Sequence, residues 1–246
     1  MTRFVRLLVF AASLLTLATP SRAEEPVDLL LVLASDVSRS VDTRKFQLQR
    51  EGYAAALSNP RVIDAIRSGP HGRIAICFVE WSGVTSQKLV IDWTIVDDAA
   101  SARKIGDQLI ELPRAFADRT SISAGIEFAM SQLERAPYRG VRRTIDVSGD
   151  GTNNSGRDVT LARDEALQKG VTINGLVILS DSPLPWNPEH TNPPGGLDGY
   201  YRNNVIGGAG AFVMVAENHN SFGQAIVKKM IAEIAFNPPP RGVILR

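Results

Sequence analysis

The sequence predicts an α/β protein with a mostly parallel central sheet, one antiparallel edge strand and helices on both faces of the sheet. Two patterns indicate this fold class. Short apolar segments alternate with segments whose apolar residues recur at helical spacing, which is the order expected of parallel strands joined by helices. One further segment alternates apolar with polar residues, as a half-buried edge strand does.

Five segments rich in apolar residues are predicted to be the parallel strands. They are residues 29–34, 73–81, 142–148, 171–179 and 211–216. Residues 88–96 differ from these, because large apolar side chains occupy every second position from Leu89 to Ile95. We expect this segment to be the edge strand, antiparallel to its neighbour through a turn at residues 82–87.

Helices are predicted where a capping residue precedes apolar residues at helical spacing. Asp42 and Asn59 can cap the first two helices. Either Asp97 or Asp98 can cap a third, which must end before Pro113. The predicted apolar helix faces lie within residues 43–57, 60–66, 102–109, 122–133, 159–166 and 221–234.

Residues 1–23 have the pattern of a secretory signal peptide. Arg3 and Arg6 precede an apolar run, and Ser21 and Ala23 suit the small-residue positions before a cleavage site. The run is short for a membrane span, although an uncleaved N-terminal anchor is the alternative. We expect cleavage after Ala23 and a periplasmic or secreted protein whose mature chain has no membrane span.

The remaining chain suits one domain, which we assign to residues 24–240, followed by a C-terminal tail at residues 241–246. Cleavage would leave 24 basic and 26 acidic residues, so the charge gives no case for nucleic acid as a partner. Cys77, the only cysteine, lies in an apolar run and is expected to be a buried structural thiol.

Oxygen-bearing side chains begin where the first predicted strand should leave the sheet. Asp36, Ser38 and Ser40 follow residues 29–34 at intervals of two. Open α/β sheets bind ligands at this edge, and a carboxylate with two hydroxyls can converge on a hard cation such as Mg²⁺. Asp150 follows the third parallel strand, and right-handed connections would bring it to the same edge.

Three motifs together resemble the metal-ion-dependent adhesion site (MIDAS) of von Willebrand factor type A (VWA) domains. They are DVSRS at residues 36–40, DRTSISAGIEFA at residues 118–129 and DVSGDG at residues 146–151. The resemblance covers nearly the whole mature chain, and more narrowly it points to a bacterial secreted subfamily whose role is uncharacterised. It implies the VWA fold, a Rossmann-like three-layer sandwich.

The resemblance also implies a function. A divalent cation, Mg²⁺ or Mn²⁺, is held directly or through water, and an Asp or Glu of an unidentified protein partner completes its coordination. The implied metal-binding residues are Asp36, Ser38, Ser40, Thr120 and Asp150. Two carboxylates offset the charge of a dication, while neutral hydroxyls leave it able to attract another anion. Thiolates and clustered imidazoles are absent, which argues against a zinc site.

Each of these residues has a purely structural alternative. Serines and threonines often cap helices, and Asp150 with Gly151 could form a plain turn. Arg39, between the two serines, places a cation where it could weaken metal binding or hold an acidic partner. Asp146, inside a predicted buried strand, could orient the loop of Asp150, or it could bond to the backbone or a neighbouring arginine.

Two other functions remain open. The segment SGDGTNN, residues 148–154, resembles a motif of haloacid-dehalogenase-type phosphatases, with Asp36 as the nucleophile. That family uses an acid two residues later, where this chain has Ser38, so we expect no enzymatic activity. The third possibility is a structural partner domain whose metal site does not bind. His71, His190 and His219 are scattered and are expected at the surface or in loops.

A long proline-rich segment, residues 180–199, leaves a predicted parallel strand at the same edge as the candidate metal site. Trp186 lies within it, and Tyr200 and Tyr201 follow it. These aromatic side chains either contact a partner or pack the segment onto its own domain, and the sequence does not separate the two.

Overall fold

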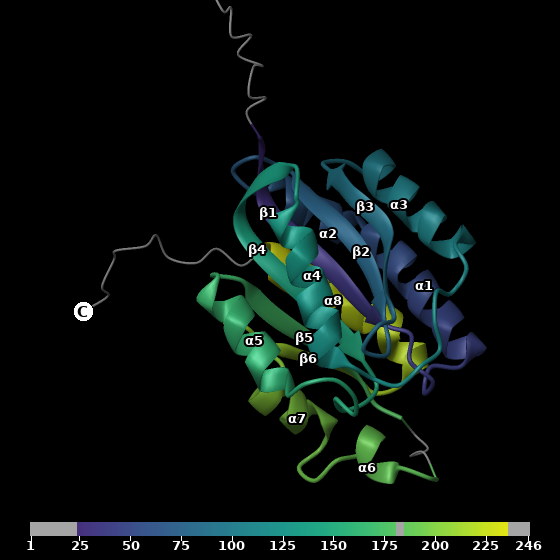
Figure 1. Ribbon diagram of the computed structural model, residues 1–246. Coiled ribbons are helices and arrows are strands. Elements are labelled where there is room, and N and C mark those ends of the chain that lie inside the picture. Colours follow the sequence, from purple (N-terminus) through teal and green to yellow (C-terminus); the bar gives the residue numbers. More distant parts are fainter. Residues whose placement is uncertain (1–23, 181–184, 236–246) are drawn as a thin grey trace, which may run out of the picture.

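The computed structural model of the chain describes residues 24–180 and 185–235 (Figure 1). Its central sheet contains the strands β1 (Glu25–Asp36), β2 (Ile74–Trp81), β3 (Gln87–Val96), β4 (Tyr138–Gly149), β5 (Thr172–Ile178) and β6 (Val213–Ala216). Their order is β3-β2-β1-β4-β5-β6. The edge strand β3 is antiparallel to β2, and the other neighbouring pairs are parallel, which confirms the predicted sheet.

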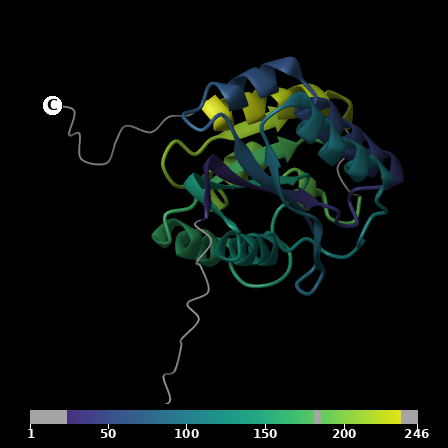
Figure 2. The same ribbon diagram turned by 90° about the horizontal axis from the view of Figure 1, so that it is seen from above.

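Helices cover both faces of the sheet, and in Figure 2 the sheet is seen between the two helical layers. On one face lie α1 (Thr43–Leu57), α2 (Pro60–Arg67), α3 (Ala99–Glu111) and α8 (Phe222–Ala235). On the other lie α4 (Ile122–Glu134), α5 (Val159–Gln168) and α7 (Leu197–Asn204). The predicted three-layer α/β sandwich is therefore confirmed.

The alternating side chains of β1 explain why the sheet is covered on both faces. Leu29, Leu31 and Leu33 are buried in the cluster that includes α1 and α8. Leu30 and Val32, which point the opposite way, are buried in the cluster that includes α4. A strand that is apolar at every position needs such cover on both sides, because either face would otherwise expose apolar surface to water.

Two strands are longer than the sequence indicates. β1 begins at Glu25 and β4 at Tyr138, where apolar residues are sparse. These two starting segments pair with each other, whereas β2 joins β1 only from Leu30 onward. The extensions are stabilised by backbone pairing and by isolated apolar residues such as Val27, which is buried in the core, so no continuous apolar run reveals them.

The proline-rich segment contains two short helices that the sequence does not predict. α6 (Pro188–Thr191) begins at a proline in the first turn, and α7 begins at Leu197. Leu197 and Tyr201 of α7 are buried against the sheet. Tertiary packing therefore stabilises helices that are too short to form on their own.

The two terminal segments predicted from the sequence lie outside the described residues. The signal peptide predicted for residues 1–23 and the tail predicted for residues 241–246 both fall there, and the domain predicted for residues 24–240 is described as far as Ala235. None of the helices in the described ranges is long and apolar enough to cross a membrane.

A buried charge cluster connects α8 to the middle of the sheet. Lys229 Nζ lies 2.6 Å from Asp146 Oδ1 of β4, and it also pairs with Glu233 one helical turn away. Asn174 Nδ2 of β5 donates to Glu233 Oε1 at 2.8 Å. All four side chains are buried, so the charged groups have each other in place of water. Burial and the neighbouring Glu233 raise the pKa of Asp146 to about 7, and Lys229 opposes the rise.

The charged partner of Asp146 is thus Lys229, which the sequence does not suggest. Arg142, one of the neighbouring arginines considered, donates instead to the carbonyl oxygens of Glu233 and Ile234, at 2.6 and 2.8 Å. Asp146 therefore anchors α8 to β4, four residues before Asp150.

We expect Lys229→Met to lower the free energy of unfolding by about 3–5 kcal/mol, because it leaves the buried carboxylates of Asp146 and Glu233 without a positive partner. Urea unfolding measures this loss. Adding Asp146→Asn should recover part of the lost stability, because it removes one of the two unpaired buried carboxylates. Lys228→Met, at an exposed position of the same helix, is the matched control and should change stability by less than about 0.5 kcal/mol. A Lys229→Met protein as stable as the wild type would contradict this account.

Candidate metal centre

The five side chains indicated by the sequence lie at the carboxyl edge of the sheet. Asp36 is the last residue of β1 and Asp150 directly follows β4, and these strands are parallel neighbours. Ser38 and Ser40 lie in the loop after β1, and Thr120 lies two residues before α4. Strand pairing thus brings together groups that are more than a hundred residues apart in the chain.

Hydrogen bonds join four of the five residues in one series. Ser38 donates its backbone N–H to Asp36 Oδ1 at 2.6 Å, and Ser38 Oγ lies 3.1 Å from Ser40 Oγ. Ser40 Oγ donates to Asp150 Oδ1 at 2.5 Å. Thr120 is tied to the loop after Asp150 through Asn154, whose Oδ1 accepts from the Thr120 N–H at 3.0 Å and whose N–H donates to the Thr120 carbonyl at 2.9 Å.

The purely structural alternatives for the hydroxyl residues do not hold. The cap of α1 is Asp42, whose Oδ1 accepts from the Lys45 N–H at 2.8 Å, so neither Ser38 nor Ser40 is needed there. The cap of α4 is Ser121 rather than Thr120. These side chains are directed to one another and to neighbouring loops at the edge of the sheet.

Each carboxylate keeps an oxygen without a hydrogen-bond donor. Asp36 Oδ2 and Asp150 Oδ2 are both buried, and neither accepts a hydrogen bond from any residue that the structure describes. Lys45 Nζ lies 3.5 Å from Asp150 Oδ2, which is an ion-pair distance but not a hydrogen bond. Leaving buried charged oxygens unpaired is costly. A dication between these strand ends would satisfy both, so the residues fit the implied metal.

The raised pKa of Asp36 also indicates that the site suits a cation. Burial raises the pKa of Asp36 to about 8, the nearby Asp150 reinforces the rise, and hydrogen bonds from Ser38 oppose it. Without a cation, Asp36 is therefore mostly protonated at neutral pH. Arg114, from the loop before α4, stabilises the Asp36 loop, because its Nη2 donates to the carbonyl oxygens of Val37 and Ser38 at 2.5 and 2.7 Å. A bound dication would favour the ionised form of Asp36 over the protonated form.

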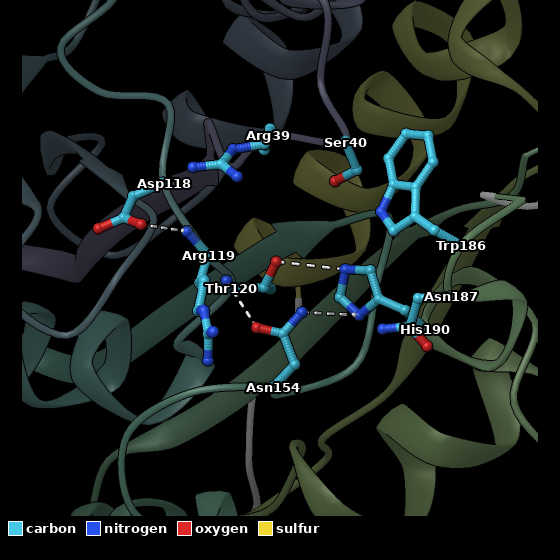
Figure 3. A pocket seen from close by; sticks show the side chains of 9 residues that line it. All are labelled: Arg39, Ser40, Asp118, Arg119, Thr120, Asn154, Trp186, Asn187 and His190. Atoms are coloured by element: carbon cyan, nitrogen blue, oxygen red, sulfur yellow. Dashed lines mark hydrogen bonds between the residues drawn. The ribbon is translucent and has the colours of Figure 1, made fainter.

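His190 of α6 contacts Thr120 (Figure 3). Since Asn154 Oδ1 accepts from the Thr120 backbone, its Nδ2 is the group that faces His190 Nδ1, at 3.4 Å. Thr152 Oγ1 lies 3.2 Å from the same nitrogen. His190 Nδ1 is therefore an acceptor, and Nε2 carries the hydrogen that is donated to Thr120 Oγ1 at 3.2 Å. The Thr120 hydroxyl keeps its own hydrogen for an acceptor inside the site.

The fit of His190 over the loop depends on Gly151. A Cβ atom at Gly151 would lie 2.3 Å from two atoms of the imidazole ring, so only glycine leaves room for it. Burial lowers the pKa of His190, with Asp150 opposing, which favours the neutral ring that this hydrogen bonding requires.

Some contributors to this site were not expected from the sequence. His190, which was expected at the surface or in a loop, is buried against Thr120. Of the other two histidines, His71 is exposed as expected and His219 is buried. Asn154 was visible in the SGDGTNN segment, but its bridging role was not. Arg114 and His190 carry no local signal, because their partners lie on other loops.

The aromatic residues in and after the proline-rich segment do not share one role: some pack the segment onto its own domain, and one is available to a partner. Tyr201 is fully buried in the core, and Tyr200 Oη accepts from the Asn153 N–H at 3.2 Å, so these residues pack the segment onto the domain. Trp186 is 76% exposed. Of the three side chains, the tryptophan is therefore the one most available to a partner.

The donor set differs from a dense metal cage. Within residues 24–180 and 185–235, no three side chains of His, Cys, Asp or Glu are close enough to hold a metal ion together. A cation at this edge would depend on the two carboxylates, the hydroxyls and water, which is the oxygen-rich surrounding that Mg²⁺ accepts.

Solved structures share the fold at low sequence identity. Proximal thread matrix protein 1 (PTMP1) of the mussel byssus superimposes with a TM-score of 0.58 at 14% identity, over 89% of this chain and 49% of PTMP1. A PTMP1 structure with a zinc-occupied MIDAS motif gives 0.56 at 15% identity, over 85% and 46%. The pilus adhesin SpaC of Lactobacillus rhamnosus GG gives 0.57 at 12% identity, over 85% and 31%. The chain spans about half the length of PTMP1 and less of SpaC.

These likenesses confirm the predicted VWA-type fold. A search of curated proteins gives no match. The family model described as "Protein of unknown function (DUF1194)" matches residues 26–238, which is most of the chain. The chain therefore belongs to the DUF1194 family, and its fold is of the VWA type.

Proposed function

We propose that this protein binds a divalent cation, Mg²⁺ or Mn²⁺, and through it an Asp or Glu side chain of a partner protein outside the cytoplasm. The proposed metal-binding residues are Asp36, Ser38, Ser40, Thr120 and Asp150. The observation that carries this proposal is the pair of buried carboxylates on adjacent strand ends, each with an oxygen that lacks a donor among the described residues.

The neutral part of the donor set supports binding of an acidic group. Two carboxylates supply two negative charges, which balance a dication without surplus. Ser38, Ser40 and Thr120 add oxygen atoms but no charge. Ser40 and Thr120 also line an open pocket of about 440 Å³, so a ligand could reach this edge from solvent. A cation held in this way would supply an electrophilic centre to which a partner carboxylate can bind.

The choice of cation follows from the donor chemistry. The oxygen donors favour a hard ion, and Mg²⁺ retains waters that a carboxylate can replace. The MIDAS motif of PTMP1 has been seen with zinc, so a metal titration of this protein must include Zn²⁺ beside Mg²⁺ and Mn²⁺.

Binding rather than catalysis fits the surroundings of Asp36. The position that a phosphatase of the haloacid-dehalogenase type needs for its general acid is Ser38, whose hydroxyl contacts Ser40. Turnover of p-nitrophenyl phosphate by the wild type and its loss in Asp36→Ala would favour the enzyme. A structural domain with a non-binding site would show neither turnover nor a response to metal.

Saturating Mg²⁺ or Mn²⁺ should raise the melting temperature of the wild type by roughly 5–10 °C, as expected when the metal is present at about a hundred times its Kd. Asp36→Ala should abolish the rise, because it removes one of the two charges that hold the cation. Asp107→Ala, at an exposed carboxylate of α3, is the matched control and should keep it. Differential scanning fluorimetry with and without chelator makes the comparison, and an equal rise in Asp36→Ala would refute the assignment.

In chelator, the Asp36 carboxyl should contribute a loss of stability as the pH is raised from 5 to 8. The raised pKa of Asp36 means that the folded protein retains a proton that the unfolded chain has released, so its contribution is present at low pH and lost as the pH passes about 8. Asp36→Asn should make the slope shallower, by up to about 1.4 kcal/mol per pH unit. Urea unfolding at each pH measures this slope. Asp146, His190 and His219 are present in both proteins, so their titrations cancel in the comparison, and identical slopes would contradict the prediction.

The partner is sought by affinity capture from the extracytoplasmic fraction of the source cells, with Mg²⁺ or chelator in the buffer. We expect a protein that is retained by the wild type with Mg²⁺ and is absent with chelator or with Asp36→Ala. Retention by Asp36→Ala to the same extent would show that the contact does not pass through this site.

A further inference from the structure

An open pocket of about 440 Å³ lies beside the candidate metal centre (Figure 3). The residues that line it include Arg39, Ser40, Asp118, Arg119, Thr120 and Trp186. Ser40 and Thr120 belong to both the pocket and the metal centre. A ligand group that reached the cation would therefore continue into this pocket.

Two arginines provide uncompensated positive charge there. The side chains of Arg39 and Arg119 are exposed, and neither makes a hydrogen bond or ion pair with any residue in the described part of the chain. Their loops are linked, because the Arg39 N–H donates to the Asp118 carbonyl at 2.9 Å. A guanidinium offers a planar fork of donors that suits a carboxylate, and two of them on linked loops favour an anionic ligand.

The one acidic residue that lines the pocket does not neutralise these arginines. Asp118 Oδ1 accepts from the Arg119 backbone N–H at 2.7 Å, and Oδ2 lies 3.4 Å from Ser86 Oγ. Its carboxylate packs against Gly83, where a Cβ atom would lie 2.4 Å from Oδ2. In Figure 3 the carboxylate points away from Trp186 and His190. The charge of the pocket therefore remains positive.

Trp186 lies across the pocket from the two arginines (Figure 3). A large aromatic side chain that is 76% exposed beside an open pocket is typical of a contact surface. Tryptophan and arginine are the residues most enriched at the energetic centres of protein–protein interfaces. This composition favours a peptide segment over a free anion.

We propose that this pocket is a second acid-binding subsite, and that the partner segment carries two acidic side chains. One binds at the cation, and the other pairs with Arg39 and Arg119 while Trp186 covers the adjacent apolar part of the segment. The inference rests on the proposed function and deepens it, because it defines the partner as a protein with a doubly acidic motif.

Binding of fluorescein-labelled glycine peptides tests this subsite, with fluorescence anisotropy in Mg²⁺ and in chelator as the measurement. One peptide carries a single Asp, and the others carry two Asp residues separated by one, two or three glycines. For the wild type in Mg²⁺, the best two-Asp peptide should bind at least about tenfold more tightly than the single-Asp peptide, since an added charge-assisted pair contributes on this scale.

The double variant Arg39→Ala/Arg119→Ala should reduce this preference to less than about twofold, while it keeps the affinity for the single-Asp peptide and the Mg²⁺-induced rise in melting temperature. Arg61→Ala/Arg103→Ala, at two exposed positions outside the pocket, is the matched control and should keep the full preference. An equal loss for both peptides would indicate only a long-range effect of charge and would overturn the subsite.

The remaining outcomes separate the two proposals. Mg²⁺-dependent binding of single-Asp and two-Asp peptides with equal affinity overturns the subsite and leaves the proposed function in place. Tighter Mg²⁺-dependent binding of an oligouronate than of every two-Asp peptide overturns the peptide as the ligand. If the wild type shows neither a Mg²⁺-induced rise in melting temperature nor Mg²⁺-dependent peptide binding, both proposals fail.

Discussion

The candidate metal centre depends on two carboxylates, Asp36 and Asp150, which the sheet holds in a buried position at the ends of adjacent strands. Burial and mutual repulsion both oppose this arrangement, as the raised pKa of Asp36 shows. The surrounding groups offset that cost only in part, through the Ser38 N–H, the Ser40 hydroxyl and the Lys45 ammonium. A dication bound between the two carboxylates would offset the remaining cost, because it would favour their ionised forms.

The fold holds these groups in place by pairing the two central strands along nearly their whole length. β1 and β4 are hydrogen-bonded from Glu25 to Ser35, so the strand ends cannot separate without breaking the centre of the sheet. The cluster of Asp146 with Lys229 fixes α8 against β4 a few residues before the site. Rigid strands carry the charges, while neutral hydroxyls and the contact residues lie on loops, where the chain can vary without loss of the core.

The fold alone does not define the ligand. PTMP1 and SpaC share this architecture at 14% and 12% identity, which leaves the recognition of any partner to the loops of this chain. Those loops place an oxygen-rich centre, one exposed tryptophan and two arginines that have no side-chain partner among residues 24–180 and 185–235 next to one another. Charge and an exposed aromatic side chain combined in one pocket favour a partner that offers acidic groups on a peptide, rather than a purely apolar surface.

The sequence by itself determined the order of the strands and the starts of the longer helices, because these are encoded locally, and it indicated the residues of the candidate metal centre through their resemblance to the MIDAS motifs. A continuous apolar run marks β2, apolar residues at helical spacing mark α4, and polar residues such as Asp42 and Asp98 stand directly before the helices they cap. The tertiary structure alone decided that Lys229 pairs with Asp146 and that His190 orients Thr120, since these partners are about 70 or more residues apart. Such contacts leave no periodic trace in the chain. They arise because buried polar groups need a partner, and only the packed fold determines which one is within reach.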